Sequence, residues 1–269
     1  MHLCARKGMG YARSMTTPRC QFFVINLDRS PDRLAVQRDQ FDRLGLTFTR
    51  VPAVDGKTLL PDLKGLNRRG YDFRHGKSIH PNELGCYLSH YRAIETFMAS
   101  GADHGVILED DAGLTDDAPA VLCALIDAAQ AWDVVNLNGR HKGQPVRQRK
   151  LSTGHDLVCY LFRRTGSAGY LINRKAGAAY LEKLLPMKVP YDHEYDRAWV
   201  YGFRYRGVQP VIVEGMTGAE STIGYETAPP GSNVKKPKWR RGSVLLYRGW
   251  NELSRVLHYA VRGKFIPRG

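Results

Sequence analysis

The stretch QFFVINLDRSPDRLAVQRDQFDRLGLTFTRV, residues 21–51, has the pattern of a strand, a helix and a second strand. Residues 21–27 are a nearly continuous apolar run, which is typical of a strand buried on both faces of a parallel sheet. A helix can start at Pro31, and apolar residues recur at helical spacing until Gly45. Residues 47–51 then read as a second strand. This βαβ unit predicts a right-handed crossover and a mostly parallel sheet.

The chain continues with an alternation of helical and strand patterns. A long helix is expected to start at Pro81, because Leu84, Leu88 and Phe97 form an apolar stripe along it. A short buried strand follows at residues 105–108. Further strands are expected at residues 134–137, 157–162, 168–172 and 211–213, helices at 119–131 and 173–185, and a basic loop at 140–150. The fold class is therefore predicted to be α/β with a mostly parallel central sheet.

The net charge of +14 is concentrated at the two ends of the chain. Residues 1–20 carry four basic and no acidic residues, and residues 233–269 carry ten basic residues and one acid. By subtraction, residues 21–232 hold 26 basic and 25 acidic residues. We expect a disordered leader over 1–20, a catalytic domain over 21–232 and a basic tail over 233–269. A neutral body makes nucleic acid an improbable partner.

The tail contains the pattern of an amphipathic basic helix at residues 242–263. Arginines recur every seven residues, and apolar residues alternate at spacings of four and three: Leu246, Trp250, Leu253, Leu257 and Ala260. Such a helix can lie in an anionic membrane interface, and the same stripe can instead pack on the domain core. The sequence leaves both alternatives open.

Two classes of membrane-directed segment are not expected. No stretch approaches the roughly 18 uninterrupted apolar residues of a membrane span, and residues 1–17 lack the apolar block of a secretory signal. We therefore expect a cytoplasmic protein, either free or peripheral on the inner face of the cytoplasmic membrane.

Three consecutive acids, Glu109, Asp110 and Asp111, follow the predicted strand at 105–108. In open α/β sheets, ligands bind beyond the carboxyl ends of strands. Adjacent carboxylates repel one another, and a divalent cation relieves that repulsion. Hard oxygen ligands suit Mn²⁺ or Mg²⁺. The cluster therefore predicts a metal site, although an acidic triplet can also be a solvated turn.

Four motifs resemble those of glycosyltransferase family 25: FVINLDRSPDR at 23–33, VPAVDG at 51–56, ELGCYLSH at 83–90 and VILEDD at 106–111. With ESTIG at 220–224, the resemblance covers roughly residues 21–224. It implies a GT-A-like nucleotide-binding fold, a nucleotide-sugar donor, inversion at the anomeric carbon and an acidic motif equivalent to DxD.

The resemblance and the position of each motif assign candidate roles. Asp111 is expected to bind the metal, with Asp110 or Glu109 supporting it or contacting the ribose of the donor, and His193 is able to complete the metal shell. Donor binding is expected from the residues that follow the first strand, from the VPAVDG and ELGCYLSH motifs and from the acidic cluster: Asn26, Arg29, Arg33, Asp55, Ser89, His90, Glu109 and Asp110. Asp55 can equally be a turn residue, and His90 can equally be a core histidine.

Inverting transfer also needs a carboxylate that takes the proton from the acceptor hydroxyl. The segment YDHEYDRAW, residues 191–199, offers Asp192, Glu194 and Asp196. Asp192 and Asp196 lie one turn apart if the segment is helical. We favour Asp192 and retain Asp196 as the second catalytic candidate, although acids at a helix start are also common without any such role.

The predicted function is the metal-dependent transfer of a hexose onto a saccharide or glycolipid acceptor. The resemblance implies galactose from UDP-galactose and an acceptor such as lipopolysaccharide or lipooligosaccharide core, with hydroxylysine-type protein as an alternative acceptor. The non-enzymatic alternative is a catalytically inactive module that binds anionic membrane or nucleic acid through its basic tails. Donor identity rests on the family analogy.

Overall fold

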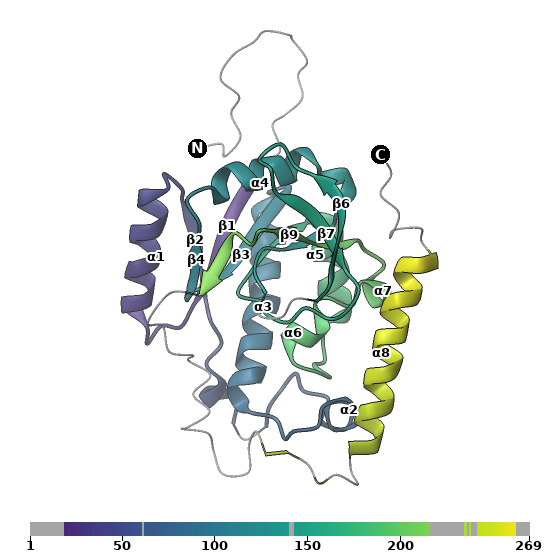
Figure 1. Cartoon of the computed structure of the whole chain (residues 1–269). Helices are drawn as coiled ribbons and strands as arrows, with labels where there is room; N and C mark the ends of the chain where they lie inside the picture. Colours follow the sequence, from purple (N-terminus) through teal and green to yellow (C-terminus); the bar gives the residue numbers. More distant parts are fainter. Residues whose placement is uncertain are drawn as a thin grey trace.

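The computed structural model (Figure 1) describes residues 19–60, 62–139, 143–215, 234–235, 237 and 241–261. Residues 1–18 of the predicted leader and the motif at 220–224 lie outside these ranges. The strands are β1 (Cys20–Asn26), β2 (Phe48–Pro52), β3 (His104–Glu109), β4 (Ala112–Leu114), β5 (Val134–Asn136), β6 (Pro145–Lys150), β7 (Asp156–Tyr160), β8 (Gly169–Asn173), β9 (Tyr205–Gln209) and β10 (Val213–Gly215).

The helices are α1 (Pro31–Arg43), α2 (Arg68–Arg74), α3 (Pro81–Ser100), α4 (Ala118–Asp127), α5 (Arg174–Lys183), α6 (Tyr191–Glu194), α7 (Ala198–Tyr201) and α8 (Gly242–Val261), with 3₁₀ turns η1 (Gly56–Leu59) and η2 (Ala129–Ala131). The predicted βαβ unit is confirmed, because β1 and β2 pair in parallel and α1 connects them.

The eight-stranded central sheet has the order β2-β1-β3-β8-β5-β9-β7-β6. The pairings of β1 with β2, β1 with β3 and β5 with β9 are parallel, and the other four are antiparallel. Only β8 and β7 therefore run against the direction of the other strands. The α/β class is right, but the expected mostly parallel sheet is mixed, because a continuous apolar run fits a buried strand of either direction.

Strand β6 lies at one edge of the sheet, within the segment that the sequence predicted as a basic loop. Its residues Pro145–Lys150 pair with β7, and most of their side chains are exposed or half-buried. Basic side chains are common on edge strands, where they discourage pairing with other chains. The basic residues of this segment therefore led to the prediction of a loop where the structure has strand β6.

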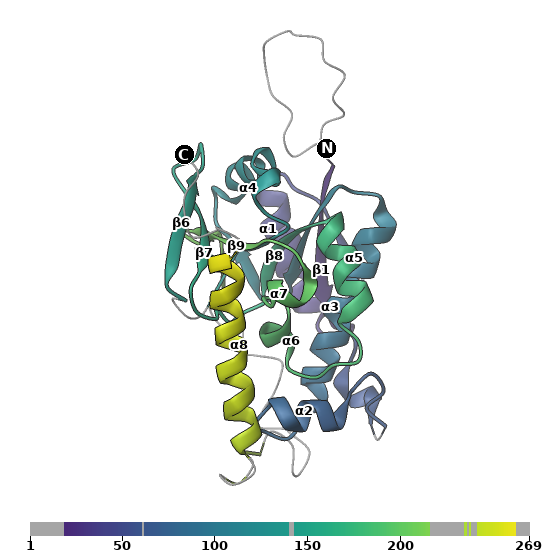
Figure 2. The ribbon, with the colours of Figure 1, turned by 90° about the vertical axis from the view of Figure 1, so that its right-hand side faces the viewer.

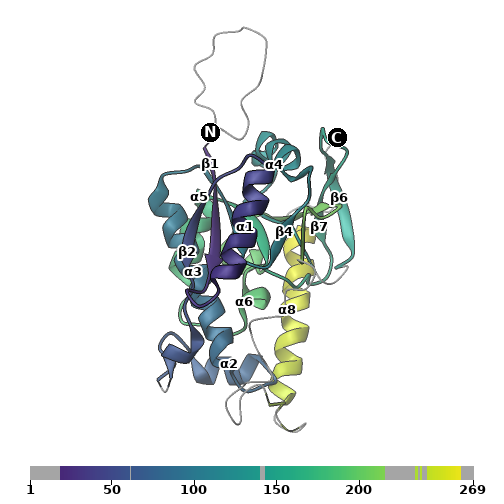
Figure 3. The same ribbon diagram turned by 90° about the vertical axis from the view of Figure 1, so that its left-hand side faces the viewer.

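Helices cover both faces of the sheet, with α1 and α4 on one face and α3 and α5 on the other (Figure 3). Alternate side chains of β1 pack on opposite faces of the sheet. Phe23 packs in the cluster that includes Phe97 of α3 and Tyr180 of α5, whereas Phe22 packs with Phe41 of α1. This alternation follows from the period of two along a strand.

The last described element, α8, lies along the outside of the body beside α2 and α7 (Figure 2). Among the helices of the described ranges, none combines the length and hydropathy needed to cross a bilayer.

Candidate functional site

Two adjoining cavities open at the carboxyl ends of the parallel strands. The smaller has a volume of about 80 Å³ and lies beyond β1 and β2, whereas the larger, of about 630 Å³, lies between β3, the segment before β8, and α6. Cys86 and Glu109 line both cavities. This is the edge at which open α/β sheets bind ligands, as the sequence predicted for the acidic cluster.

The smaller cavity has an apolar wall and a charged rim. The wall is formed by Ile25, Leu27, Ala53 and Val54. At the rim, the guanidinium of Arg29 forms an ion pair with Asp55, which also accepts a hydrogen bond from the backbone N–H of Lys57. Of the predicted donor-binding residues, those that line this cavity are Arg29, Asp55, Ser89, His90, Glu109 and Asp110.

Helix α3 shapes one wall of the smaller cavity through two residues of the ELGCYLSH motif. The Ser89 hydroxyl accepts from the N–H of Val54 at 2.8 Å and donates to the Gly85 carbonyl at 2.7 Å. A Cβ on Gly85 would lie 2.6 Å from the carbonyl oxygen of Val54, so only glycine allows this close approach. The hydroxyl of Ser89 is therefore engaged by the backbone and holds the wall in place.

Asp110 is bonded by residues that follow or end β1. Its carboxylate accepts hydrogen bonds from Asn26 Nδ2 at 2.8 Å and from Arg33 at 3.0 Å, and Asn26 is itself bonded by Arg50. Neither Asn26 nor Arg33 lines either of these two cavities. Donor binding by these two residues stays a prediction, and the structure shows both of them donating to the Asp110 carboxylate.

Asp111 faces the larger cavity together with Glu109. Burial, followed by the charges of Glu109 and Asp110, raises the pKa of Asp111 to about 6. Its Oδ1 is buried and has no hydrogen-bond partner among the described residues. The charge of Arg33 favours the ionised form but does not outweigh burial and the two neighbouring acids, and Oδ1 has no hydrogen-bond partner among the described residues.

Glu109 lies between the two cavities and contacts Ser167 and His90. Ser167 donates to its Oε1 at 3.1 Å, and Nε2 of the buried His90 lies 3.3 Å from the same oxygen. The His90 ring stacks on Tyr191 with centroids 4.0 Å apart. The donor atoms of Cys86, His90 and Glu109 lie within 4.8 Å of one another.

The side chains of Asp192 and His193 also line the larger cavity. Asp192 is 34% exposed, and its Oδ1 lies 3.8 Å from His193 Nε2. Burial, with the positive charges of Arg163 and Arg248, lowers the pKa of His193 to about 3, so its imidazole is neutral. His75 on the same cavity shows the same lowering, to about 3, mainly because of burial.

The predicted metal set Asp111, Asp110 and His193 is not brought together as a unit. Asp111 and His193 share the larger cavity, but Asp110 lines the smaller one and is bonded by Asn26 and Arg33. Asp110 and Asp111 form the turn between β3 and β4, and this turn leaves Asp110 on the smaller cavity and Asp111 on the larger one.

Asp196, the second catalytic candidate, is buried against α8. Its side chain is fully buried and forms an ion pair of 2.9 Å with Arg255 of α8. Burial raises the pKa of this carboxyl to about 6, with Arg255 acting in the opposite direction. It lines neither of the two cavities of the described residues, because the helix pattern that joined it to Asp192 ends at Glu194.

The sequence reasoning missed several residues that line the larger cavity: Lys77, Glu83, Cys86, Asn138, Arg163 and Ser167. Glu83 and Cys86 stand inside the ELGCYLSH motif, and Cys86 lies four residues before His90 on the same helix face, so spacing could have indicated them. Arg163 and Ser167 belong to an irregular segment before β8, which carries no periodic signal.

Comparisons with known proteins give one family. The model described as "Glycosyltransferase family 25 (LPS biosynthesis protein)" matches residues 20–195. The protein named "Glycosyltransferase 25 family member" from Aedes aegypti is 29% identical over 203 residues, which make up 69% of this chain and 33% of that protein. The protein of the same name from Drosophila melanogaster is 28% identical over 206 residues, 70% of this chain and 33% of that protein.

A further relative carries a different name. "Inactive glycosyltransferase 25 family member 3" from Mus musculus is 31% identical over 136 residues, which are 46% of this chain and 22% of that protein. The chain thus spans about a third of the two insect relatives. Among solved structures, the "Crystal Structure of A197 from STIV" covers 73% of this chain and 83% of its own, with 11% identity and a TM-score of 0.36.

Proposed function

Because the chain belongs to glycosyltransferase family 25, we propose that it is an active, metal-dependent enzyme that transfers a hexose from a nucleotide sugar with inversion at the anomeric carbon. The observation that carries this proposal is the larger cavity. It holds a buried, unpartnered carboxylate oxygen on Asp111 and a half-exposed carboxylate on Asp192. The Asp111 carboxylate suits binding of a cation, and the Asp192 carboxylate suits uptake of a proton from the acceptor.

The arrangement of the sheet supports a GT-A-like assignment. The smaller cavity opens beyond the carboxyl ends of β1 and β2, the strands of the N-terminal βαβ unit, and the larger one adjoins it beyond β3, where nucleotides bind in α/β folds. We assign the nucleoside to the smaller cavity, since its apolar wall suits a planar base and the Arg29–Asp55 pair at its rim offers polar contacts. The hexose and the acceptor then share the larger cavity.

The residues on the larger cavity fit a hard divalent cation. Asp111 presents a buried oxygen without a partner among the described residues, and Glu109 lies beside it on the same cavity. We propose that these two carboxylates hold Mn²⁺ or Mg²⁺, and that the neutral imidazole of His193 is available to complete the shell. When bound, the ion supplies positive charge beside the departing diphosphate.

Asp192 is the proposed general base. The acceptor hydroxyl attacks the anomeric carbon from the face opposite the diphosphate; the new C–O bond forms as the bond to the diphosphate oxygen breaks. Asp192 takes the hydroxyl proton. Asp192 lies on the larger cavity and is partly exposed, so it can contact an acceptor. Asp196, in contrast, is buried and forms an ion pair with Arg255.

The substrates are proposed from the family. Its description as an LPS biosynthesis protein supports a saccharide acceptor such as lipopolysaccharide or lipooligosaccharide core. UDP-galactose is proposed as the donor from the motif resemblance alone. A second candidate is a catalytically inactive module, which the name of the mouse relative favours. The presence of Glu109, Asp111 and Asp192 on one cavity favours the enzyme.

Thermal stabilisation by nucleotide sugars, measured with and without Mn²⁺, tests the proposal. A donor at one hundred times its Kd stabilises by about 2.7 kcal/mol, which for a chain of this size raises Tm by about 5–10 °C. We expect a UDP-hexose with Mn²⁺ to give such a shift and Asp111→Asn to abolish the Mn²⁺-dependent part together with sugar transfer.

Asp116→Asn is the matched control, because the Asp116 side chain is 84% exposed and pairs only with the surface residue Arg43 in the described contacts. It should behave as wild type. If Asp111→Asn retains metal-dependent turnover, the metal assignment is wrong. If donor and metal stabilise the wild type but neither transfer nor donor hydrolysis occurs, the inactive module is the better description.

A further inference from the structure

Helix α8 faces the body with its polar side. Arg255 is 1% exposed and pairs with Asp196, and the buried Asn251 accepts a hydrogen bond from Arg197 at 3.1 Å. Tyr259, also buried, donates to the carbonyl oxygen of Tyr205 at 3.3 Å. The side of the helix that carries its arginine and asparagine is therefore the side that anchors it.

The opposite side of α8 is apolar and exposed. It presents the outward stripe, which consists of Leu245 (67% exposed), Leu246 (76%), Trp250 (67%), Leu253 (50%), Val256 (39%) and Leu257 (49%). At about 100° per residue these side chains span an arc of about 140°. The remaining positions within that arc are Gly242, Gly249 and Ala260, so no charged residue interrupts it.

Figure 2 looks onto this helix from outside, and no other labelled element lies in front of it. An amphipathic helix that stabilised only the body would turn its apolar side inward. Here the orientation is reversed over five turns of helix. A continuous exposed stripe of leucine and tryptophan is typical of a surface that contacts a membrane or another protein.

The composition of the segment that contains α8 favours a membrane. Residues 233–269 carry ten basic residues and a single acid, Glu252. That acid lies 3.3 Å from Arg255 and is thus engaged on the anchored side. Leucine and tryptophan on one face with an excess of basic residues is the composition by which helices enter the interface of an anionic bilayer. We propose that the outward stripe of α8 docks the protein on an anionic lipid bilayer.

Docking would also orient the larger cavity. The site of a Cβ on Gly76 lies 3.5 Å from Arg241 and 3.8 Å from Val244 at the start of α8, and the residues on either side of Gly76, His75 and Lys77, line the cavity. The start of α8 is thus adjacent to the cavity wall. Given the proposed function, this places the acceptor side of the enzyme near the headgroups, where a glycolipid acceptor presents its saccharide.

Flotation of the full chain with lipid vesicles tests the docking. The probes are vesicles of phosphatidylcholine alone and of phosphatidylcholine mixed with phosphatidylglycerol. We expect binding to the anionic vesicles that weakens as salt is added. The double variant Leu246→Gln/Trp250→Gln should lose at least about tenfold in vesicle partition, because it removes the two most exposed large side chains of the stripe.

Phe162→Gln is the matched control, since Phe162 is 54% exposed but lies outside α8; it should bind vesicles as wild type does. Equal Tm values for all three proteins would establish that the fold is retained. The proposal is overturned if the double variant binds as tightly as wild type, if neutral vesicles bind equally well, or if the stripe instead mediates self-association that the double variant abolishes. Flotation requires no sugar transfer, so its outcome is independent of the proposed reaction.

Discussion

The three neighbouring acids have three different environments. Asp110 is bonded by Asn26 and Arg33, Glu109 is held by Ser167 beside His90, and Asp111 retains a buried oxygen without a partner among the described residues. Of the three carboxylates, Asp110 is therefore neutralised by Arg33, whereas Glu109 and Asp111 line the larger cavity. The cation is proposed for the second pair, because both carboxylates line the larger cavity and Asp111 carries a buried oxygen with no hydrogen-bond partner among the described residues.

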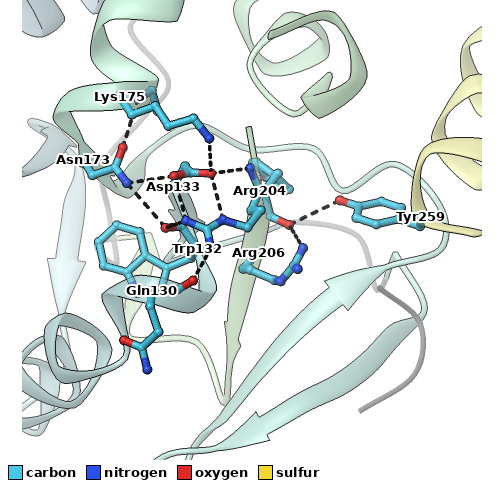
Figure 4. A network of polar contacts seen from close by, with 10 residues as sticks. Gln130, Trp132, Asp133, Asn173, Lys175, Arg204, Arg206 and Tyr259 are labelled. Carbon is cyan, nitrogen blue, oxygen red and sulfur yellow. Dashed lines mark hydrogen bonds and ion pairs between the residues drawn. The ribbon is translucent and has the colours of Figure 1, made fainter. Parts of the chain in front are cut away.

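A fourth acid, Asp133, is fully neutralised within the protein (Figure 4). It is 1% exposed and accepts from the Arg204 N–H at 2.7 Å, from Arg204 Nε at 3.0 Å and from Asn173 at 3.0 Å. Burial alone would raise its pKa, but the hydrogen bonds from Arg204 and Asn173 outweigh burial and hold the pKa well below the usual value. Its ionised form therefore stabilises the fold.

Asp133→Asn is expected to lower the free energy of unfolding at about pH 7 by about 3 kcal/mol, since it leaves Arg204 without its charged partner. The native pKa is depressed, so this stabilisation is present above the unfolded pKa of about 3.9 and is lost as pH falls toward the native value. The difference in the free energy of unfolding between the variant and the wild type should be smaller at about pH 3 than at about pH 7. Urea unfolding at both pH values checks this, and a gap that stays constant would contradict it.

At the scale of elements, the approach of α3 to the segment after β2 forms the wall of the smaller cavity. Gly85 of α3 and Gly56 of η1 make this contact: a Cβ on Gly56 would lie 2.4 Å from the carbonyl oxygen of Pro81. At both glycines the nearest atoms are backbone atoms of the other segment. The motifs VPAVDG and ELGCYLSH therefore lie against each other, where the segment after β2 packs on α3.

Gly85→Ala should destabilise the protein by about 1–3 kcal/mol, because the new methyl group meets rigid backbone atoms. It should also weaken donor binding by moving the Val54 wall. Gly249→Ala is the matched change in a helix, since Gly249 has nothing within 4 Å of its Cβ site; it should stabilise by up to about 1 kcal/mol. Urea unfolding and donor titration measure both effects. Destabilisation by Gly249→Ala would show that α8 does not tolerate a methyl group there.

For the whole molecule, the attachment of α8 depends on a buried ion pair rather than on apolar packing of its stripe. Asp196→Leu should cost about 3–5 kcal/mol, because it leaves the buried Arg255 without its nearest carboxylate. Combining it with Arg255→Met should recover most of the loss, since a buried pair replaced by apolar groups is often neutral. Thermal and urea unfolding measure the two variants.

If the double variant is no more stable than Asp196→Leu alone, the ion pair does not explain the attachment. Donor turnover supplies a second readout: because Asp196 lies away from both cavities, the double variant should retain it. Loss of turnover in a folded double variant would return Asp196 to the list of catalytic candidates.

The sequence by itself determined the α/β class, the βαβ unit and the family, because apolar periodicity and ordered motifs are local properties of the chain. It also placed the acidic cluster at the carboxyl end of a strand. Only the tertiary structure decided that β8 and β7 run in the opposite direction, that Asn26 and Arg33 bind Asp110, and that Asp196 is sealed by Arg255.

The same division applies to α8. The spacing of its apolar residues predicted an amphipathic helix but not which side faces the body, since that choice depends on whether the body offers a buried acid or an apolar groove. Asp196, 59 residues earlier in the chain, supplies the acid. Strand direction, side-chain partners and helix orientation are all set by contacts between residues far apart in sequence, and such contacts form only when the chain has folded.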